Sequence, residues 1–264
     1  MKNFSSQNSN LKRKLKNLDL TIGTWLTIPN QSVVEVLSTG GFDWITIDLE
    51  HSAIDKMELQ NLIGHIQGNN LEALVRVHKN DEVVIKHSLD AGANGIIVPM
   101  IKNSEDAQNA VNFAKYPPSG QRGVGLFRAQ NYGIGFEEYV DWLNNDLIII
   151  AQIEHIEAVN NLNEILNVKG IDGILVGPYD LSASMGIPGE FENIKVVESI
   201  KEIEEITISS GKSLGVHVVS SDCLKVVDKI MKKYNFIAFG IDFLFLGDKI
   251  RNEMQALKDM QNEK

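Results

Sequence analysis

Short apolar runs alternate with amphipathic stretches along most of the chain. The runs are mostly rich in β-branched residues and lack strict polar–apolar alternation, as expected of strands buried on both faces of a parallel sheet. Eight such runs occur, at residues 22–27, 44–47, 73–77, 95–98, 147–153, 173–176, 214–218 and 236–239. Apolar residues recur at helical spacing between them, over residues 56–67, 81–91, 104–115, 156–166, 196–210 and 222–233.

Eight strand–helix units in one chain of 264 residues predict a single domain folded as a (β/α)8 TIM barrel. The barrel is expected over residues 21–247. The extension 1–20 contains a short helix that closes the barrel bottom, and a C-terminal helix follows over 248–264. A doubly wound sheet is the alternative, but the glycine-rich phosphate-binding turn typical of it does not occur. The longest insertion, 117–146, is expected over the top face as an active-site loop.

Charge and cysteine content narrow the class of protein. The formal net charge of −10 argues against nucleic acid as a partner, because phosphate binding needs a basic surface. A single cysteine, Cys223, excludes an internal disulfide and a cysteine-rich metal site, and favours a reducing cytoplasm. No apolar run approaches the roughly 20 residues of a membrane span, and the N-terminus lacks the apolar core of a secretory signal.

Polar and aromatic residues follow most of the predicted strands. Barrel enzymes build their active sites from the C-terminal ends of the strands, so these residues are the candidates for chemistry. They are Trp25; Asp48, Glu50 and His51; Arg76; Gln152 and Glu154; Tyr179 and Asp180; His217; and Asp242. His217 and Asp242 are interpreted as packing or supporting residues.

Three of the candidate groups suggest specific roles. Glu154 and Asp180 follow adjacent strands, where two carboxylates need a proton or a cation, and oxygen ligands suit Mg²⁺ or Mn²⁺. Asp180 could instead cap the helix that follows it. His51 is a candidate general base or a packed polar residue. Arg76 ends a buried strand and needs an anion, either an acid such as Glu50 or a substrate carboxylate.

Several separate motifs at these residues resemble the HpcH/HpaI family of pyruvate-dependent class II aldolases. The resemblance extends from about residue 23 to residue 247. Its motifs are FDWITIDLEH (42–51), VRV (75–77), LDAGANGIIVPM (89–100), YPPSGQRGVG (116–125), QIE (152–154), IDGILVGPYDLSASMG (171–186) and FGID (239–242). Leu49 and Tyr179 depart from the Gly and Ala of many members, and Tyr179 is positioned to reshape the aldehyde pocket.

The resemblance implies retro-aldol cleavage of a 4-hydroxy-2-oxo acid to pyruvate and an aldehyde. A divalent metal (Mg²⁺ or Mn²⁺, with Co²⁺ possible) would bind Glu154 and Asp180 and stabilise a pyruvate enolate. Gln152 and the backbone at 179–180 would hold pyruvate, with Trp25 lining the site. Arg76 would stabilise the enolate oxygen, and His51 would exchange the proton of the aldol hydroxyl.

The resemblance also implies an oligomer. It pairs His51 with Asp90, which precedes the fourth strand and could reach His51 only from a neighbouring subunit; Asp48 is the alternative partner. Family members are typically hexamers, built as trimers of dimers with exchanged C-terminal helices. The rival readings are an acyl-CoA lyase of the citrate or malyl-CoA type, a Schiff-base aldolase using Lys79 or Lys102, and a non-catalytic scaffold.

Overall fold

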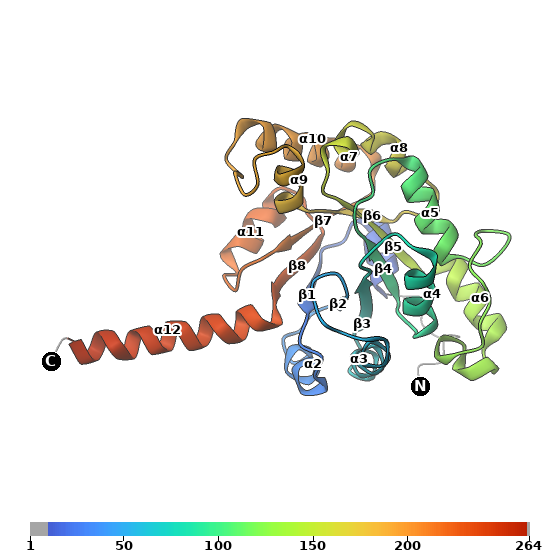
Figure 1. Ribbon diagram of the computed structural model, residues 1–264, viewed down its shortest axis with the longest axis horizontal. Helices are drawn as coiled ribbons and strands as arrows, with labels where there is room; N and C mark the ends of the chain where they lie inside the picture. Colours follow the sequence, from blue (N-terminus) through green and yellow to red (C-terminus); the bar gives the residue numbers. More distant parts are fainter. Residues whose placement is uncertain (1–9, 263–264) are drawn as a thin grey trace.

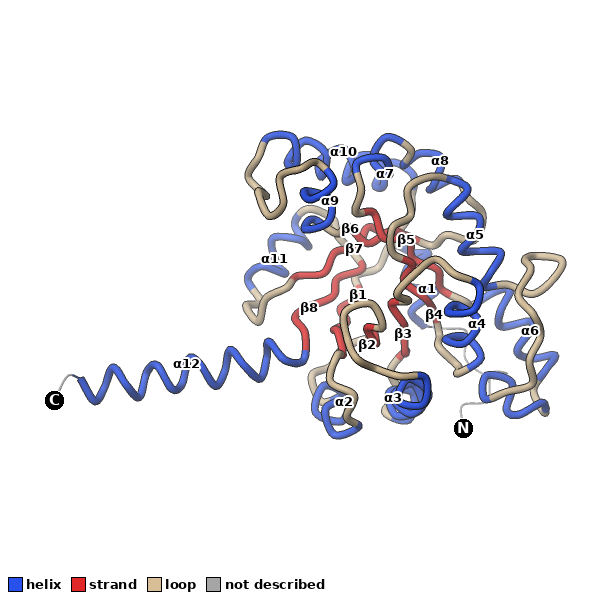
Figure 2. Tube along the Cα trace, in the orientation of Figure 1, coloured by secondary structure: helices blue, strands red, loops and turns tan. Residues whose placement is uncertain are grey.

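The computed structural model describes residues 10–262 and shows a closed parallel barrel (Figures 1 and 2). Each strand pairs with the next along the chain, and β8 pairs with β1. The strands are β1 (Thr21–Leu26), β2 (Trp44–Asp48), β3 (Glu72–Arg76), β4 (Gly95–Val98), β5 (Ile148–Ile153), β6 (Gly173–Val176), β7 (Ser213–Val218) and β8 (Phe236–Ile241). The predicted (β/α)8 barrel is therefore confirmed.

Helices surround the barrel, as Figure 2 shows. They are α1 (Asn10–Asn17), α2 (Gln31–Ser38), α3 (Lys56–Gly68), α4 (Glu82–Asp90), α5 (Ser104–Ala114), the short 3-10 segment η2 (Arg128–Gly133), α6 (Phe136–Asn145), α7 (Ile156–Asn160), α8 (Leu162–Asn167), α9 (Pro178–Ser184), α10 (Ile194–Ser210), α11 (Leu224–Met231) and α12 (Asp242–Asn262). The single helix expected over 156–166 is broken at Asn161 into α7 and α8. No helix within residues 10–262 is long and apolar enough to cross a membrane.

The barrel interior is filled by large side chains and closed at its lower end by α1. Trp44 stacks on Phe236 with ring centroids 4.4 Å apart. A Cβ at Gly23 would lie 2.0 Å from the Trp44 ring, so only glycine leaves room for this stack. Leu11 and Leu15 of α1 pack into the same interior cluster. The structure thus has a short helix within the extension 1–20, and this helix covers the barrel bottom; residues 1–9 of the extension lie outside the described range.

The insertion at 117–146 lies at the lower end of the barrel, so its prediction as a top-face loop is wrong for its own chain. It follows α5, which descends from the end of β4, and it leads into the start of β5. Arg128 donates to the carbonyl of Ala91 at 2.8 Å and to Gln67 Oε1 at 2.9 Å, near the C-terminal ends of α4 and α3. The prediction failed because connections from helix to strand lie at the bottom of a barrel, whatever their length.

The last helix, α12, begins directly after β8 and extends away from the barrel (Figure 1). The Asp242 carboxylate accepts hydrogen bonds from the backbone N–H groups of Thr27 and Ile28, both at 2.7 Å, which ties the start of α12 to the end of β1. Residues 249–262 are exposed throughout. The helix starts six residues earlier than the predicted 248, and residues 263–264 lie outside the described range.

Candidate active site

An arginine–aspartate pair lies at the upper end of the barrel. Asp48 and Arg76 are partners in the parallel register of β2 and β3, so both side chains reach the same strand ends. Arg76 donates from Nε to Asp48 Oδ1 at 2.9 Å and from Nη2 to Asp48 Oδ2 at 2.6 Å. A second acid, Glu50, lies 3.1 Å from Arg76 Nη1. Asp48 therefore provides the anion that a buried arginine needs, and Glu50 lies beside the pair.

Burial and the charges of their neighbours shift the pKa values of Asp48, Glu50 and Arg76. Burial raises the pKa of Asp48, but Arg76 and the N–H groups of Glu50 and His51 outweigh it, so the pKa lies below its ordinary value. Burial and the charges of Asp48 and Asp180 raise the pKa of Glu50 despite Arg76. Arg76 has a pKa above its ordinary value, because its carboxylate neighbours outweigh burial. Asp48 and Arg76 thus form a fixed ion pair that carries its full charge near neutral pH.

Glu154 is a buried carboxylate at the end of β5, with 2% of its surface exposed. Its Oε1 accepts the backbone N–H of Met100 at 2.7 Å, and its Oε2 accepts a short hydrogen bond from Gln152 Nε2. A Cβ at Gly177 would lie 2.9 Å from Glu154 Oε2, so glycine is needed for this approach. The Met100 N–H was missed by sequence reasoning, because a backbone donor leaves no signal in residue type.

Burial is the main reason that the pKa of Glu154 rises to about 7, and the charges of Glu50 and Asp180 add to it. Asp180 lies in the first turn of α9 and is exposed. No side chain within the described part of the chain caps this helix, whose N-cap is Gly177, so the capping role considered for Asp180 is not seen. What the structure shows for Asp180 is that its charge acts on Glu154.

The side-chain oxygen atoms of Glu154, Asp180 and Gln152 fit a hard divalent cation. Glu154 and Asp180 repel each other, and Gln152 Oε1 is buried with no hydrogen-bond partner among residues 10–262. A cation would relieve that repulsion, and hard cations prefer such oxygen donors. Among residues 10–262 no three His, Cys, Asp or Glu side chains converge as a metal cluster. The chain thus offers two carboxylates, and the other coordination positions would be open to water or substrate.

Trp25 and His217 support the site from inside the barrel. Their rings stack with centroids 4.6 Å apart, and the Arg76 guanidinium lies 5.2 Å from the Trp25 ring centroid. Trp25 is only 1% exposed, so in this structure it packs beneath Arg76 instead of forming an open pocket wall. His217 Nε2 lies 2.8 Å from the Gly240 carbonyl, which makes it the protonated ring nitrogen. The supporting role predicted for His217 is what the packing shows.

Burial of His217 predicts a loss of stability in mild acid. Burial lowers its pKa to about 4, whereas the unfolded chain has the ordinary value near 6.5. The folded state therefore resists protonation, and the free energy of unfolding falls by up to about 3 kcal/mol as the pH drops from 6.5 to 4. Urea unfolding of wild type and His217→Phe at several pH values measures this. The free energy of unfolding of the wild type, relative to that of His217→Phe, should decrease as the pH drops over that interval. A difference that stays constant with pH would contradict the prediction.

His51 and Asp90 lie at opposite ends of the barrel within one chain. His51 follows β2 and is exposed, and its N–H donates to Asp48 Oδ1 at 3.3 Å. Asp90 ends α4 at the lower end, where Arg122 Nη2 donates to its Oδ1 at 2.5 Å. The structure does not bring His51 and Asp90 together within one chain, in agreement with the expectation that Asp90 could reach His51 only from a neighbouring subunit. The Asp48 oxygens are occupied by Arg76 and backbone N–H groups, which leaves Asp48 an ion-pair partner for Arg76.

An aromatic pair stands beside Asp180. Tyr179 is exposed and meets the ring of Phe191 edge-on, with centroids 4.7 Å apart and planes at 81°. Phe191 comes from the loop between α9 and α10, which carries no periodic signal, and sequence reasoning missed it. Tyr179 therefore forms part of a surface next to the two carboxylates.

Comparison with known proteins places the whole barrel in one family. The family model of the HpcH/HpaI aldolase/citrate lyase family matches residues 21–247. A 2-keto-3-deoxy-L-rhamnonate aldolase of Escherichia coli O9:H4 (strain HS) is 33% identical over 257 residues, which cover 95% of this chain and 94% of the relative. A crystal structure of an HpcH/HpaI aldolase/citrate lyase family protein from Burkholderia cenocepacia J2315 has a TM-score of 0.89 and 28% identity, covering 96% of this chain and 100% of that one. The crystal structure of the citrate synthase SbnG has a TM-score of 0.82 and 28% identity, covering 97% and 98%.

Proposed function

Because this chain belongs to the HpcH/HpaI aldolase/citrate lyase family and is a carbon–carbon lyase, we propose in detail how it cleaves a 4-hydroxy-2-oxo acid to pyruvate and an aldehyde. The observation that carries the proposal is the set of charges at the strand ends. A rigid Arg76–Asp48 pair faces a buried Glu154, whose pKa is raised partly by Asp180. Such a site favours the formation of negative charge next to a cation.

Glu154 and Asp180 are proposed to hold the divalent cation, with Mg²⁺ or Mn²⁺ preferred. A bound cation supplies a Lewis acid that lowers the free energy of an enolate. Gln152 lies against Glu154 and is proposed to orient the pyruvate carboxylate together with the backbone at 179–180. Arg76 is held by Asp48 with its charge intact, so it can donate a hydrogen bond to the oxygen on which the enolate charge develops.

His51 is proposed to take the proton from the aldol hydroxyl during cleavage and return it during condensation. An imidazole suits this task because its ordinary pKa is near working pH. The exposed position of His51 above the strand ends allows it to reach a substrate that rests on Arg76 and Glu154. Trp25 is proposed to act through Arg76, whose guanidinium it supports.

The first test of this function is metal-dependent decarboxylation of oxaloacetate, which forms the pyruvate enolate without requiring a known aldehyde. Treatment with EDTA should abolish pyruvate release by the purified protein, and Mn²⁺ or Mg²⁺ should restore it. Activity that survives EDTA but is trapped by borohydride would transfer the chemistry to a lysine. The absence of activity under every condition would refute the proposal.

Asp90 is proposed to complete the site of a neighbouring subunit by hydrogen-bonding to its His51. The support within this chain is the way in which Asp90 is held. Arg122 is fully buried, with its guanidinium 4.9 Å from the Tyr116 ring centroid and 5.6 Å from that of Tyr139. A buried cation in this cage fixes one Asp90 oxygen and leaves the other for a partner. The insertion would thereby contribute to a site in trans.

The exposed helix α12 supports a homo-oligomer, proposed to be a hexamer with exchanged C-terminal helices. Ile250, Met254 and Leu257 lie on one face of α12 and are half exposed. In a (β/α)8 barrel the eighth helix normally covers the last strand, yet α12 extends away (Figure 1). Two apolar side chains of α11, Leu224 and Met231, are exposed next to the position that the eighth helix would normally occupy. A second copy of α12 would bury both surfaces.

Charges on the apolar face of α12 should dissociate the assembly. The double variant Ile250→Glu/Leu257→Glu places two carboxylates in the proposed contact, whereas the control Asn252→Glu places one on the opposite face. Sedimentation velocity should show a smaller particle for the double variant and an unchanged one for the control. An unchanged mass for both would contradict the exchange of α12.

The substrate is proposed to be a sugar acid, as the name of the 2-keto-3-deoxy-L-rhamnonate aldolase relative suggests, so that its cleavage releases a small hydroxylated aldehyde. Tyr179 precedes Asp180 in the chain and is proposed to restrict the space next to the cation site, together with Phe191, whose ring it contacts. A hydroxylated aldehyde of three carbons or so would meet the Tyr179 hydroxyl and the exposed His51. The choice among such aldehydes depends on these side chains and on residues from the neighbouring subunit.

A further inference from the structure

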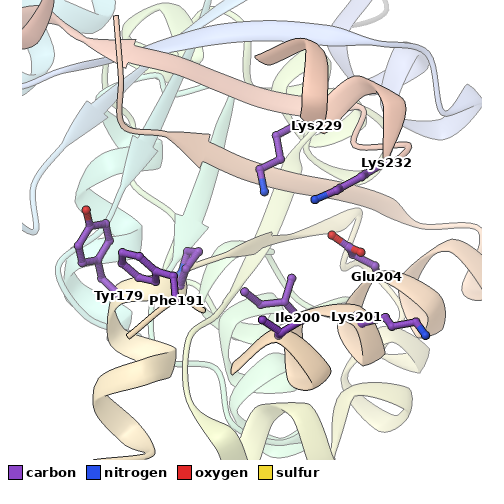
Figure 3. Close-up of a pocket in the computed structure, with 9 residues that line it drawn as sticks. Tyr179, Phe191, Ile200, Lys201, Glu204, Lys229 and Lys232 are labelled. Atoms are coloured by element: carbon purple, nitrogen blue, oxygen red, sulfur yellow. The ribbon is translucent and has the colours of Figure 1, made fainter. Parts of the chain in front are cut away.

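A groove of about 490 Å³ runs between α10 and α11 on the outside of the barrel (Figure 3). Tyr179 and Phe191 form one end, and Lys229 and Lys232 come from the opposite wall. Ile200 lines the α10 side between them. Asp48, His51, Arg76, Glu154 and Asp180 do not line this groove, although Tyr179, the chain neighbour of Asp180, forms its end.

The groove holds an ammonium group that no carboxylate neutralises by contact. Within the described residues, Lys229 Nζ makes no hydrogen bond or ion pair within 4.0 Å, although it is half-buried; it lies 5.2 Å from the Tyr234 ring centroid. The nearby Glu204 carboxylate accepts the Tyr234 hydroxyl at 2.8 Å. Burial and the charge of Lys232 lower the pKa of Lys229. An anion in the groove would remove this destabilisation.

The other lysines of the groove can turn toward such an anion. Lys232 pairs with Asp228 at 3.4 Å and Lys201 with Glu205 at 3.7 Å, both one helical turn apart along exposed helix surfaces. Pairs of this kind contribute little to stability, so their ammonium groups are available to a stronger anion. Three lysines therefore line the groove against one carboxylate, Glu204, in a chain whose net charge is −10.

The chemistry of the walls defines the class of ligand. Ammonium groups without any arginine suit a compact phosphate better than a planar bidentate carboxylate. Ile200, Phe191 and Tyr179 offer an apolar and aromatic surface for the remainder of the molecule. We propose that this groove binds an organic phosphate, with the phosphate group at Lys229 and Lys232 and its body against Ile200 and the Tyr179–Phe191 pair.

A second copy of α12 is not expected in this groove. The exposed apolar residues of α11, Leu224 and Met231, do not line this groove, whereas Lys229 and Lys232 do. The proposed helix exchange and the proposed ligand thus use different residues of α11. The groove can be filled by a small molecule in the assembled protein.

Calorimetric titration of the full-length protein in EDTA tests the proposal, with phenyl phosphate and inorganic phosphate as probes. We expect one site per chain and about tenfold tighter binding of phenyl phosphate, because only it has a ring to bury. Lys229→Met should weaken both probes by about ten- to a hundredfold, since one charge-assisted contact is lost. The control Lys225→Met, on the same helix but outside the groove, should bind like the wild type.

Three results would overturn the proposal. They are the absence of saturable binding up to about 10 mM, equal affinities of Lys229→Met and Lys225→Met, and loss of binding in Arg76→Met, which would place the phosphate in the active site. If Lys229→Met does not fold, Lys232→Met provides the same comparison, because the Lys232 side chain is 51% exposed. None of these outcomes depends on the aldolase activity, so this proposal and the proposed function can fail separately.

Discussion

Replacing Glu154 by glutamine is expected to slow metal-dependent oxaloacetate decarboxylation by about a thousandfold. The substitution keeps the shape of the side chain and the acceptor for the Met100 N–H, but it removes the negative charge proposed to hold the cation. Affinity for Mn²⁺ should fall on the order of a hundredfold or more. Steady-state kinetics and Mn²⁺ titration monitored by electron paramagnetic resonance would measure both changes.

The same substitution should stabilise the metal-free protein at alkaline pH. The folded-state pKa of Glu154 is raised to about 7, so its contribution to stability is fully present below the unfolded value near 4.5 and is lost as the pH rises through 7. At pH 8 in EDTA, Glu154→Gln should therefore exceed wild type by up to about 3 kcal/mol. Gln152 can reorient so that its unpartnered Oε1 accepts the new amide.

A matched control separates the charge of Glu154 from a general effect of amide substitution. Glu157→Gln alters an acid three residues away whose side chain is 59% exposed, and neither activity nor stability should change appreciably. If Glu154→Gln retained more than a tenth of wild-type activity at saturating Mn²⁺, the metal-holding role of Glu154 would be wrong.

Two inactive variants should restore activity when they assemble together. His51→Asn and Asp90→Asn are each expected to lower activity by about a hundredfold or more, because proton transfer loses its base or the partner of that base. If Asp90 acts on the His51 of a neighbouring subunit, random mixing gives an intact pair at about one site in four. Unfolding and refolding an equal mixture should therefore recover about a quarter of wild-type activity.

The control mixture combines His51→Asn with Arg76→Lys. Both residues belong to the upper end of the same barrel, so every mixed site carries one defect and activity should stay low. Recovery in the first mixture and not in the second would identify a site shared between subunits. If neither mixture recovers while refolded wild type does, Asp90 has no role in trans and its pair with Arg122 is structural only.

The strand ends illustrate how far the sequence alone predicts a site. Apolar runs of the right length located every barrel strand to within two residues of its observed limits, because strands buried on both faces have few other compositions. The residues after those strands included Asp48, Arg76, Glu154 and Asp180, all of which lie at the upper end of the barrel. Parallel strands bring their carboxyl ends together, so these residues were predictable as one group.

The partners within that group were not predictable. Arg76 had two acids within reach along the chain, and only the β2–β3 register shows that Asp48 takes both of its hydrogen bonds. Residue type also did not indicate the Met100 N–H donor or the contact between Tyr179 and Phe191. The length of the 117–146 insertion does not reveal the end of the barrel at which it lies, because that end is decided by the direction of α5, which leads into it.

The sequence by itself determined the barrel fold and the family motifs that indicate the chemistry. It also determined at which end of the barrel the acids, the arginine and the histidine lie. Those features depend on periodicity and on residue type, which are local properties. The tertiary structure decided which charges neutralise each other, how strongly burial perturbs Glu154 and His217, and that Asp90 and α12 face away from their own site. These depend on distances between segments far apart in the chain, because electrostatic energy changes with separation and with exclusion of water.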